Sequence, residues 1–193
     1  MNQPKGGASM IFRGPHTDVS APKINVVDFV LGDISAHENK TAIIQTETNR
    51  KISYRELSDS ISRLAAGLQK EGFKKGDVLA IYSPNVPEYA VIFLAVLKLG
   101  GICTTVNPLY TADELAKQLI DSKAKLIVTV PDFLDKAEVA IKKHPVNDLI
   151  VIGGAQGHRK LEDLMQSNNT VIAPEISAEN DVCALPYSSG TTG

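Results

Sequence analysis

The stretch that most constrains the fold is Val78-Leu79-Ala80-Ile81-Tyr82, in which no residue is charged. A strand with one solvated face alternates polar and apolar residues, so an unbroken run of this length indicates a strand buried on both faces, as in a parallel sheet. Ser83-Pro84-Asn85 then leads into a helical pattern with Pro87 in its first turn, where a missing N–H costs little. The run therefore predicts a strand, a turn and a helix in an α/β fold.

Strand-length and helix-length patterns alternate along most of the chain. Further strands are expected at residues 41–45, 51–53, 102–106, 125–130, 149–152 and 182–185. Helices are expected at residues 25–34, after Ser53, from Pro87 to Gly100, after Thr111, at residues 131–141 and at residues 161–165. The alternation predicts an α/β class protein, with layered helices on a largely parallel sheet and right-handed crossovers.

Two of the predicted helices begin with a capping box. The pairs Ser53 with Glu56 and Thr111 with Glu114 have the required spacing, in which a hydroxyl and a carboxylate satisfy two N–H groups at the helix start. These pairs fix the predicted start of each helix.

The last eight residues form a run rich in hydroxyl groups and glycine. They read Pro186-Tyr187-Ser188-Ser189-Gly190-Thr191-Thr192-Gly193 and follow the last predicted strand. Exposed N–H groups, hydroxyl donors and little steric bulk are what a loop around polyphosphate oxygens needs. Composition alone favours the alternative of a flexible linker, because clusters of Ser, Gly and Thr usually mark solvated coil.

Spacing excludes three better-known glycine motifs. A Walker loop requires Gly-Lys-Ser/Thr, and no lysine follows Gly193 in this sequence. A nucleophile elbow requires Gly two residues before its serine, where Ser188 has Pro186 and Ser189 has Tyr187. Residues 153–157, Gly-Gly-Ala-Gln-Gly, lack the dinucleotide spacing and are predicted to form a turn.

The run at residues 187–193 resembles the first half of the phosphate-binding signature of adenylate-forming enzymes, the superfamily of acyl- and aryl-CoA ligases, luciferases and peptide-synthetase adenylation domains. The second half of that signature, Pro-Lys-Gly, is missing. Upstream stretches resemble the family in the same order: Ile52-Ser53-Tyr54-Arg55-Glu56-Leu57, Gly76-Asp77 with Ser83-Pro84-Asn85-Val86-Pro87-Glu88, and Gly100-Gly101 with Asn107-Pro108-Leu109-Tyr110-Thr111. The last of these and Ile11-Phe12-Arg13 are similar to the 4-coumarate-CoA-ligase and luciferase branch.

The resemblance covers about residues 25 to 193 and implies an activity for the parent enzyme. Such an enzyme joins a carboxylic acid to the α-phosphate of ATP, releases pyrophosphate, and transfers the acyl group from AMP to the thiol of coenzyme A. The implied ligands are ATP, Mg²⁺, coenzyme A and a small-molecule carboxylic acid. Residues 1–23 would be a tail, and residues 24–193 the N-terminal portion of an AMP-binding domain, truncated within its phosphate loop.

The same resemblance assigns the candidate site. The predicted phosphate-binding residues are Ser188, Ser189, Gly190, Thr191, Thr192 and Gly193. The hydroxyls would donate to the β- and γ-phosphates, and the glycines would let the backbone approach closely. Tyr187 is expected to pack at the end of the strand. No catalytic residue is predicted, and residues 1–193 alone are not expected to adenylate a substrate.

Two alternatives remain open at this point. One is a non-catalytic α/β fragment that binds a partner or an anion. The other is a luciferase-like or peptide-synthetase adenylation unit, since these share the same loop.

Charge and hydropathy limit the partners and the location. The formal net charge is -2 and the charges are interspersed, so no nucleic-acid partner is expected. The longest apolar run, residues 89–97, is shorter than the roughly 20 residues that span a bilayer, and the N-terminus lacks the apolar core of a signal peptide. These features predict an intracellular, soluble protein without a transmembrane segment, cytoplasmic or peroxisomal.

The cysteines and histidines do not predict a metal site. Cys103 and Cys183 lie in apolar surroundings and are expected to be buried free thiols, although a disulfide between them stays open. None of the four histidines stands at metal-ligand spacing from a cysteine or carboxylate, so no metal ligand is predicted.

Overall fold

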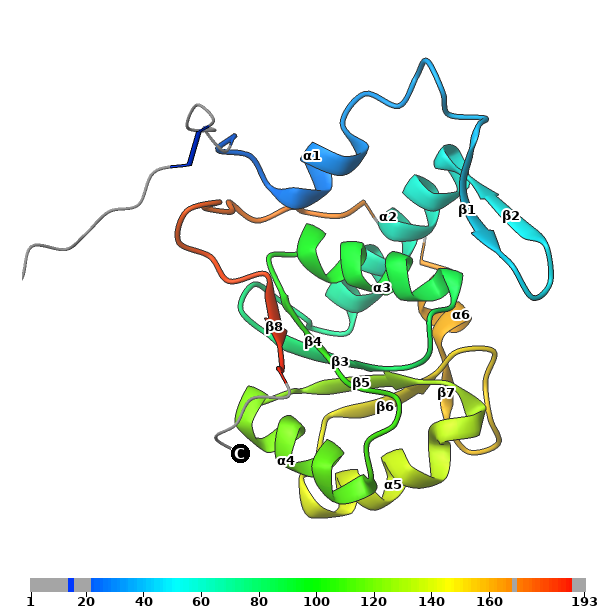
Figure 1. Cartoon of the computed structure of the whole chain (residues 1–193), viewed down its shortest axis with the longest axis vertical. Helices are drawn as coiled ribbons and strands as arrows, with labels where there is room; N and C mark the ends of the chain where they lie inside the picture. The colour runs from blue at the N-terminus through cyan, green and yellow to red at the C-terminus, as the bar shows by residue number, and fades with distance from the viewer. Residues whose placement is uncertain (1–13, 16–21, 168–169, 189–193) are drawn as a thin grey trace, which may run out of the picture.

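The centre of the fold is a six-stranded sheet in which every neighbouring pair of strands is parallel. The computed structural model describes residues 14–15, 22–167 and 170–188 of the chain. The strand order is β7-β6-β5-β3-β4-β8 (Figure 1). The strands are β3 (Val78–Tyr82), β4 (Ile102–Thr105), β5 (Leu126–Thr129), β6 (Asp148–Val151), β7 (Arg159–Lys160) and β8 (Ala184–Pro186). The predicted α/β class is confirmed.

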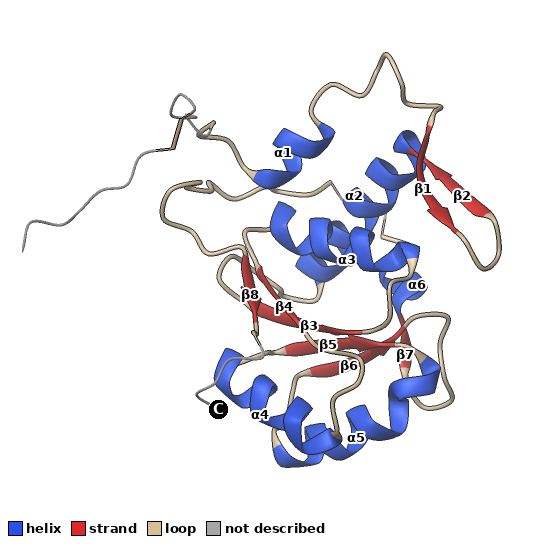
Figure 2. Ribbon diagram, in the orientation of Figure 1, coloured by secondary structure: helices blue, strands red, loops and turns tan. Residues whose placement is uncertain are grey.

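Helices cover both faces of this sheet (Figure 2). On one face lie α1 (Val26–Leu31), α2 (Tyr54–Lys70), α3 (Pro87–Lys98) and α6 (Leu161–Leu164). On the other lie α4 (Ala112–Ser122) and α5 (Leu134–Lys143), which follows a short 3-10 turn, η1 (Pro131–Phe133). A separate antiparallel pair, β1 (Thr41–Gln45) and β2 (Arg50–Ser53), packs beside α2 and α3.

Both predicted capping boxes are present. The Ser53 hydroxyl accepts a hydrogen bond from Glu56 N at 3.2 Å, and Ser53 N donates to Glu56 Oε2 at 2.7 Å. At the start of α4, Glu114 N donates to the Thr111 hydroxyl at 3.3 Å and Thr111 N to Glu114 Oε2 at 2.8 Å. Each box thus satisfies N–H groups that the first turn of a helix leaves without partners.

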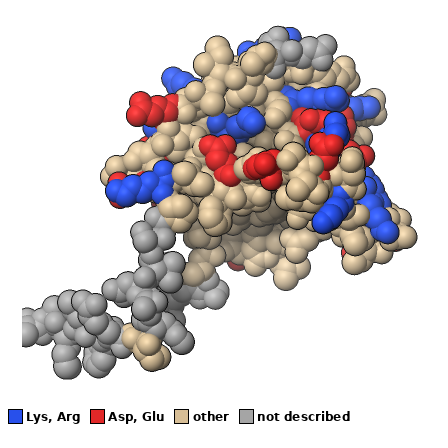
Figure 3. Space-filling model, turned by 90° about the horizontal axis from the view of Figure 1, so that it is seen from above, with Lys and Arg blue, Asp and Glu red and all other residues tan. Residues whose placement is uncertain are grey.

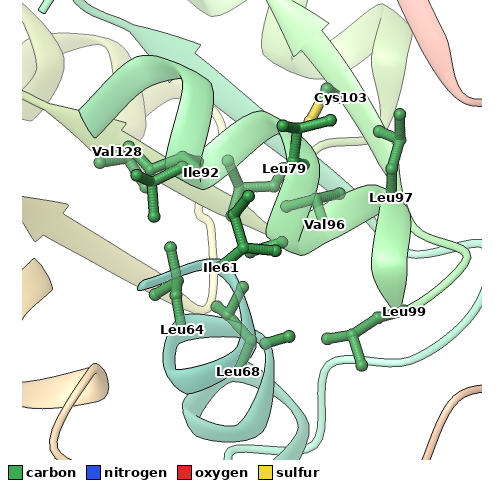
Figure 4. Close-up of a cluster of buried hydrophobic side chains, with 14 of the residues drawn as sticks. Ile61, Leu64, Leu68, Leu79, Ile92, Val96, Leu97, Leu99, Cys103 and Val128 are labelled. Atoms are coloured by element: carbon green, nitrogen blue, oxygen red, sulfur yellow. The ribbon is translucent and has the colours of Figure 1, made fainter. Parts of the chain in front are cut away.

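The alternating side chains of β3 belong to two different cores. Leu79 and Ile81 pack among the apolar side chains of α2 and α3, a cluster that Figure 4 shows in part. Ala80 and Tyr82 pack on the opposite side with residues of α4 and α5. All five residues of β3 are buried, which confirms the prediction from the unbroken apolar run.

The chain reverses its direction across the sheet between β3 and β5. From β3 it runs through α3 to β4, whereas from β5 it runs through α5 to β6 on the other side. In open α/β sheets such a reversal creates a crevice at the carboxyl ends of the strands, where ligands bind. The carboxyl edge formed by β3, β4, β5 and β8 is therefore where a functional site is expected.

The segment before β8 crosses the helices of one face. The amide of Gln69, in α2, donates to Ile172 O at 2.7 Å and accepts from Ile172 N at 2.9 Å. Lys75 Nζ donates to Glu175 O at 2.8 Å and forms an ion pair of 2.6 Å with Asp181. These contacts guide the chain to the edge of the sheet, where β8 pairs with β4.

Several local expectations need correction. Cys183 is exposed, whereas Cys103 is buried as predicted, and both thiols are free. Ile120, whose apolar side chain would favour burial in the helix after Thr111, is 52% exposed because the buried face of α4 is centred on Leu115 and Leu119. The last strand lies at residues 184–186 rather than 182–185, because Pro186 can occupy an edge strand without a backbone donor.

Basic and acidic side chains are mixed on the surface that Figure 3 shows from above. On that face the described residues form no continuous basic stripe of the kind that follows a nucleic-acid backbone. Within the described part of the chain, no helix is both long and apolar enough to cross a membrane.

Candidate phosphate-binding site

The candidate site begins where β8 ends. β8 runs parallel to β4, with Thr104 opposite Leu185 and Thr105 opposite Pro186, so its carboxyl end lies at the predicted edge of the sheet. Ser188, two residues beyond β8, is exposed. The other predicted site residues, Ser189, Gly190, Thr191, Thr192 and Gly193, lie outside the described residues, as does the Ile11-Phe12-Arg13 stretch.

An open groove of about 840 Å³ lies beside Ser188. One wall consists of the end of β8 and Tyr187, and the other is a face of α4. Glu114, Gln118 and Asp121 stand at intervals of four and three residues on that helix, which places them on the same face. The groove thus joins the start of the predicted phosphate loop to one polar face of α4.

A buried hydrogen-bond chain connects α4 to β8 through β4. Gln118 Nε2 donates to Thr104 Oγ1 at 2.8 Å and to Thr105 O at 3.0 Å. Thr104 Oγ1 in turn donates to Leu185 O at 3.1 Å. Because a carbonyl oxygen can only accept, the contact with Thr105 O fixes which end of the Gln118 amide is the NH₂ group.

A second contact connects α4 to the residue before Ser188. The Tyr187 hydroxyl donates a hydrogen bond to Asp121 Oδ2. Partial burial, followed by the hydrogen bond to Asp121 and its negative charge, raises the pKa of Tyr187 to about 12. The ring remains 40% exposed, so Tyr187 lies at the end of the strand as predicted but is held there mainly through its hydroxyl.

The Asn107–Thr111 segment, whose sequence contributed to the resemblance, lies at the same edge. The Asn107 side chain accepts from Leu109 N at 3.0 Å, and Tyr110 O accepts from the buried Tyr82 hydroxyl at 3.1 Å. Tyr110 lines the groove. This part of the motif therefore forms an ordered connection from β4 to α4 next to the candidate loop.

Other residues and segments named in the sequence analysis have structural contacts. Glu88 forms an ion pair of 2.6 Å with Arg50, which ties α3 to β2. The Gly153–Gly157 segment is a turn in which all three glycines have φ between 74° and 84°, a conformation that favours glycine. His158 lies 2.9 Å from Glu138, and within the described residues no group of three potential metal ligands occurs.

Sequence reasoning did not identify Gln118 or Asp121. Their signal was their helical spacing from Glu114. Gln118 contacts Thr104, 14 residues earlier, but Asp121 contacts Tyr187, which lies 66 residues further along the chain. Such contacts depend on strand order, which the sequence pattern did not define.

Comparison with known proteins places the chain in a family. A model of the family described as AMP-binding enzyme matches residues 33–193. The chain therefore belongs to the AMP-binding enzyme family, as its motifs predicted.

Individual relatives agree with this assignment. The chain is 36% identical over 198 residues to 4-coumarate--CoA ligase 4 of Arabidopsis thaliana and 33% identical over 187 residues to 4-coumarate--CoA ligase CCL1 of Humulus lupulus. In both comparisons 95% of this chain is covered but 34% of the relative, so the chain spans about a third of their length.

Solved structures show the same fold. An anthranilate CoA ligase in complex with anthranoyl-AMP superposes with a TM-score of 0.80 at 26% identity, covering 89% of this chain and 32% of that one. The luciferase-like enzyme from the mealworm Zophobas morio superposes with a TM-score of 0.83 at 20% identity, covering 96% and 44%. Because the identity to the luciferase-like enzyme is only 20%, that similarity supports a shared fold alone.

Proposed function

We propose that residues 24–193 are the N-terminal part of the adenylation domain of an AMP-forming carboxylic acid–CoA ligase of the 4-coumarate-CoA-ligase type. The observation that carries the proposal is that the hydroxyl- and glycine-rich run begins at Ser188, at the carboxyl end of β8. Open α/β sheets bind ligands at this edge. Family membership and the two ligase relatives support the class of reaction.

The proposed reaction has two steps. In the first, a carboxylate oxygen of the acid attacks the α-phosphorus of ATP, and the bond to the bridging oxygen breaks as pyrophosphate leaves. In the second, the thiolate of coenzyme A attacks the acyl carbon, and AMP leaves with the electron pair. The difficulty of the first step is the negative charge that builds up on the leaving group, which donors fixed in advance can stabilise.

The contribution of this chain is to hold that leaving group. The hydroxyls of Ser188, Ser189, Thr191 and Thr192 would donate to the β- and γ-phosphate oxygens. Gly190 and Gly193 would allow the backbone N–H groups to approach them. Mg²⁺, when bound with the nucleotide, would neutralise further phosphate charge.

The charges of the groove bear on where a polyphosphate would bind. Glu114 and Asp121 line the groove together with Lys117. Hydrogen bonds from Thr111 hold the pKa of Glu114 below its usual value, so this carboxylate is ionised at neutral pH. A polyphosphate in the groove would face these carboxylates, and we therefore propose that it binds outside the groove.

Isotope exchange tests the proposal. A full-length protein carrying this chain is expected to exchange labelled pyrophosphate into ATP when a carboxylic acid is present. Replacing both Thr191 and Thr192 by valine should lower the exchange rate by about 100-fold or more, because removing one such donor costs roughly 10²–10³ in rate elsewhere. An unchanged rate would exclude the threonines from the site. Residues 1–193 alone are expected to show no exchange.

A further inference from the structure

We propose that α4 is a positioning element for the phosphate loop, in which Asp121 and Gln118 hold the end of β8 from two sides. The inference rests on the proposed function of residues 188–193 and assigns a role to a helix outside that loop. Asp121 would act through Tyr187, and Gln118 through Thr104.

β8 needs support beyond the sheet itself. It is three residues long, it ends in a proline that cannot donate a hydrogen bond, and β4 is its one strand neighbour among the described residues. An edge strand of this length places the following residues poorly on its own. Donors that stabilise a developing charge must nevertheless be held close to their productive positions, because a displacement of about 1 Å can cost on the order of 100-fold in rate.

The buried contact fixes the strand. Thr104 is fully buried, and its hydroxyl lies between the amide of Gln118 and the carbonyl of Leu185. A shift of β8 along β4 would break this chain of hydrogen bonds. Gln118 thereby holds β8 at a set position relative to α4.

The surface contact fixes the residue from which the loop departs. Tyr187 immediately precedes Ser188, and its hydroxyl bonds to Asp121 across the groove. The ring can therefore not rotate away from α4 without losing this hydrogen bond. The direction in which the chain enters the loop is set by this pair.

Each of the two residues has a feature that is unfavourable for the stability of the fold. Asp121 lies in the last turn of α4, where the helix dipole disfavours a carboxylate, and none of the described residues in that turn is basic. Gln118 Oε1 is buried and has no hydrogen-bond partner among the described residues. Proteins tolerate such unfavourable features mainly at functional sites. Their presence in two residues on the same face of α4 therefore supports a role of this face in the site.

Binding of inorganic tripolyphosphate to residues 1–193 tests the proposal, with ¹⁵N chemical shifts as the readout. Asp121→Ala and Tyr187→Phe are each expected to raise the Kd by about threefold to tenfold, the loss typical of one hydrogen bond. Asp121→Asn should remain within about twofold of the parent chain, because its amide oxygen can still accept from Tyr187. The double variant Asp121→Ala/Tyr187→Phe should bind no more weakly than either single variant, since both break one interaction.

The design separates positioning from charge and from stability. Removing the carboxylate lessens repulsion of an anion, so a purely electrostatic role predicts tighter binding by both Asp121 variants. Asp59→Ala, on an exposed site in the interior of α2, is the matched control and should leave the Kd and the unfolding midpoint unchanged. Both Asp121 variants should show the same midpoint as this control.

Two results would overturn the proposal, and only the second would also overturn the proposed function. If Asp121→Ala binds tripolyphosphate as tightly as Asp121→Asn, α4 does not position the loop, and the proposed function stands. If the parent chain itself shows no tripolyphosphate-dependent shift in residues 188–193, the phosphate-binding function of the loop fails, and the role of α4 fails with it.

Discussion

The amide of Gln118 and the hydroxyl of Thr104 form a buried hydrogen bond of 2.8 Å that joins a helix to the sheet beneath the candidate site. The same threonine hydroxyl donates to Leu185 O, so a single side chain connects α4, β4 and β8. Thr104 therefore contributes both to the packing of the fold and to the support of the candidate site.

Replacing Thr104 by valine is expected to lower the free energy of unfolding by about 1–3 kcal/mol. The shape of the side chain is kept, but Gln118 Nε2 loses one acceptor and Leu185 O loses its side-chain donor. Urea denaturation followed by circular dichroism measures the change. Thr41→Val, in the exposed first position of β1, is the matched control and should change stability little. A Thr104→Val chain as stable as the parent would show that the hydrogen-bond chain has no net effect.

Tyr187 is expected to ionise well above the ordinary pKa of a phenol. Its pKa is raised to about 12 from an ordinary value of 10.0, by partial burial and then by Asp121. Absorbance at the phenolate band, compared between the parent chain and Tyr187→Phe, isolates this group. Asp121→Ala should return its pKa toward 10.0.

The sign of the linked stability follows from this direction. The neutral phenol is favoured in the folded chain, so its contribution to stability is complete below pH 10 and is lost as the pH rises toward about 12. The Tyr187→Phe chain should lack this part of the loss of folding stability at alkaline pH. An ionisation of Tyr187 at its ordinary pKa would contradict the contact with Asp121.

The two cysteines should differ sharply in reactivity. Cys183 is exposed, whereas Cys103 is buried and its pKa is raised above the ordinary value, first by burial and then by the nearby Cys183. Because the thiolate is the reactive form, a disulfide reagent should modify one thiol in the native chain and the second after unfolding. Cys183→Ser should abolish the fast reaction. Two equally fast thiols would contradict the packing of Cys103, in β4, against α3.

Loss of a capping box should destabilise the fold by a measurable amount. Ser53→Ala and Thr111→Ala each remove a hydroxyl that caps a helix, and each is expected to lower the free energy of unfolding by about 1 kcal/mol. Urea denaturation measures both. Ser58→Ala, within α2 and away from its start, serves as the control. Equal stability of all three variants with the parent chain would show that the caps contribute nothing.

Local sequence signals predicted the helices and strands well, but they did not predict which strands lie side by side in the sheet. The unbroken run of β3 and the capping boxes at Ser53 and Thr111 identified buried strands and helix starts, because these depend on residues close in the chain. Strand order did not follow, since β5 lies beside β3 rather than beside β4.

Exposure was the least predictable property. Cys183 has apolar neighbours in sequence, yet it directly precedes the edge strand β8 and is exposed. The pairing of Tyr187 with Asp121 could not be inferred either, because it brings together residues 66 positions apart that carry no shared pattern. Tertiary placement, rather than local preference, decided both.

The measurement that tests the account most directly is hydrogen exchange of residues 186–193 in a full-length protein carrying this chain, with and without ATP and Mg²⁺. Binding of the polyphosphate engages backbone N–H groups of this segment, so we expect the nucleotide to slow exchange there more than in α5, which lies away from the groove. Exchange in residues 186–193 that is the same with and without the nucleotide would contradict the assignment of this run as a phosphate loop.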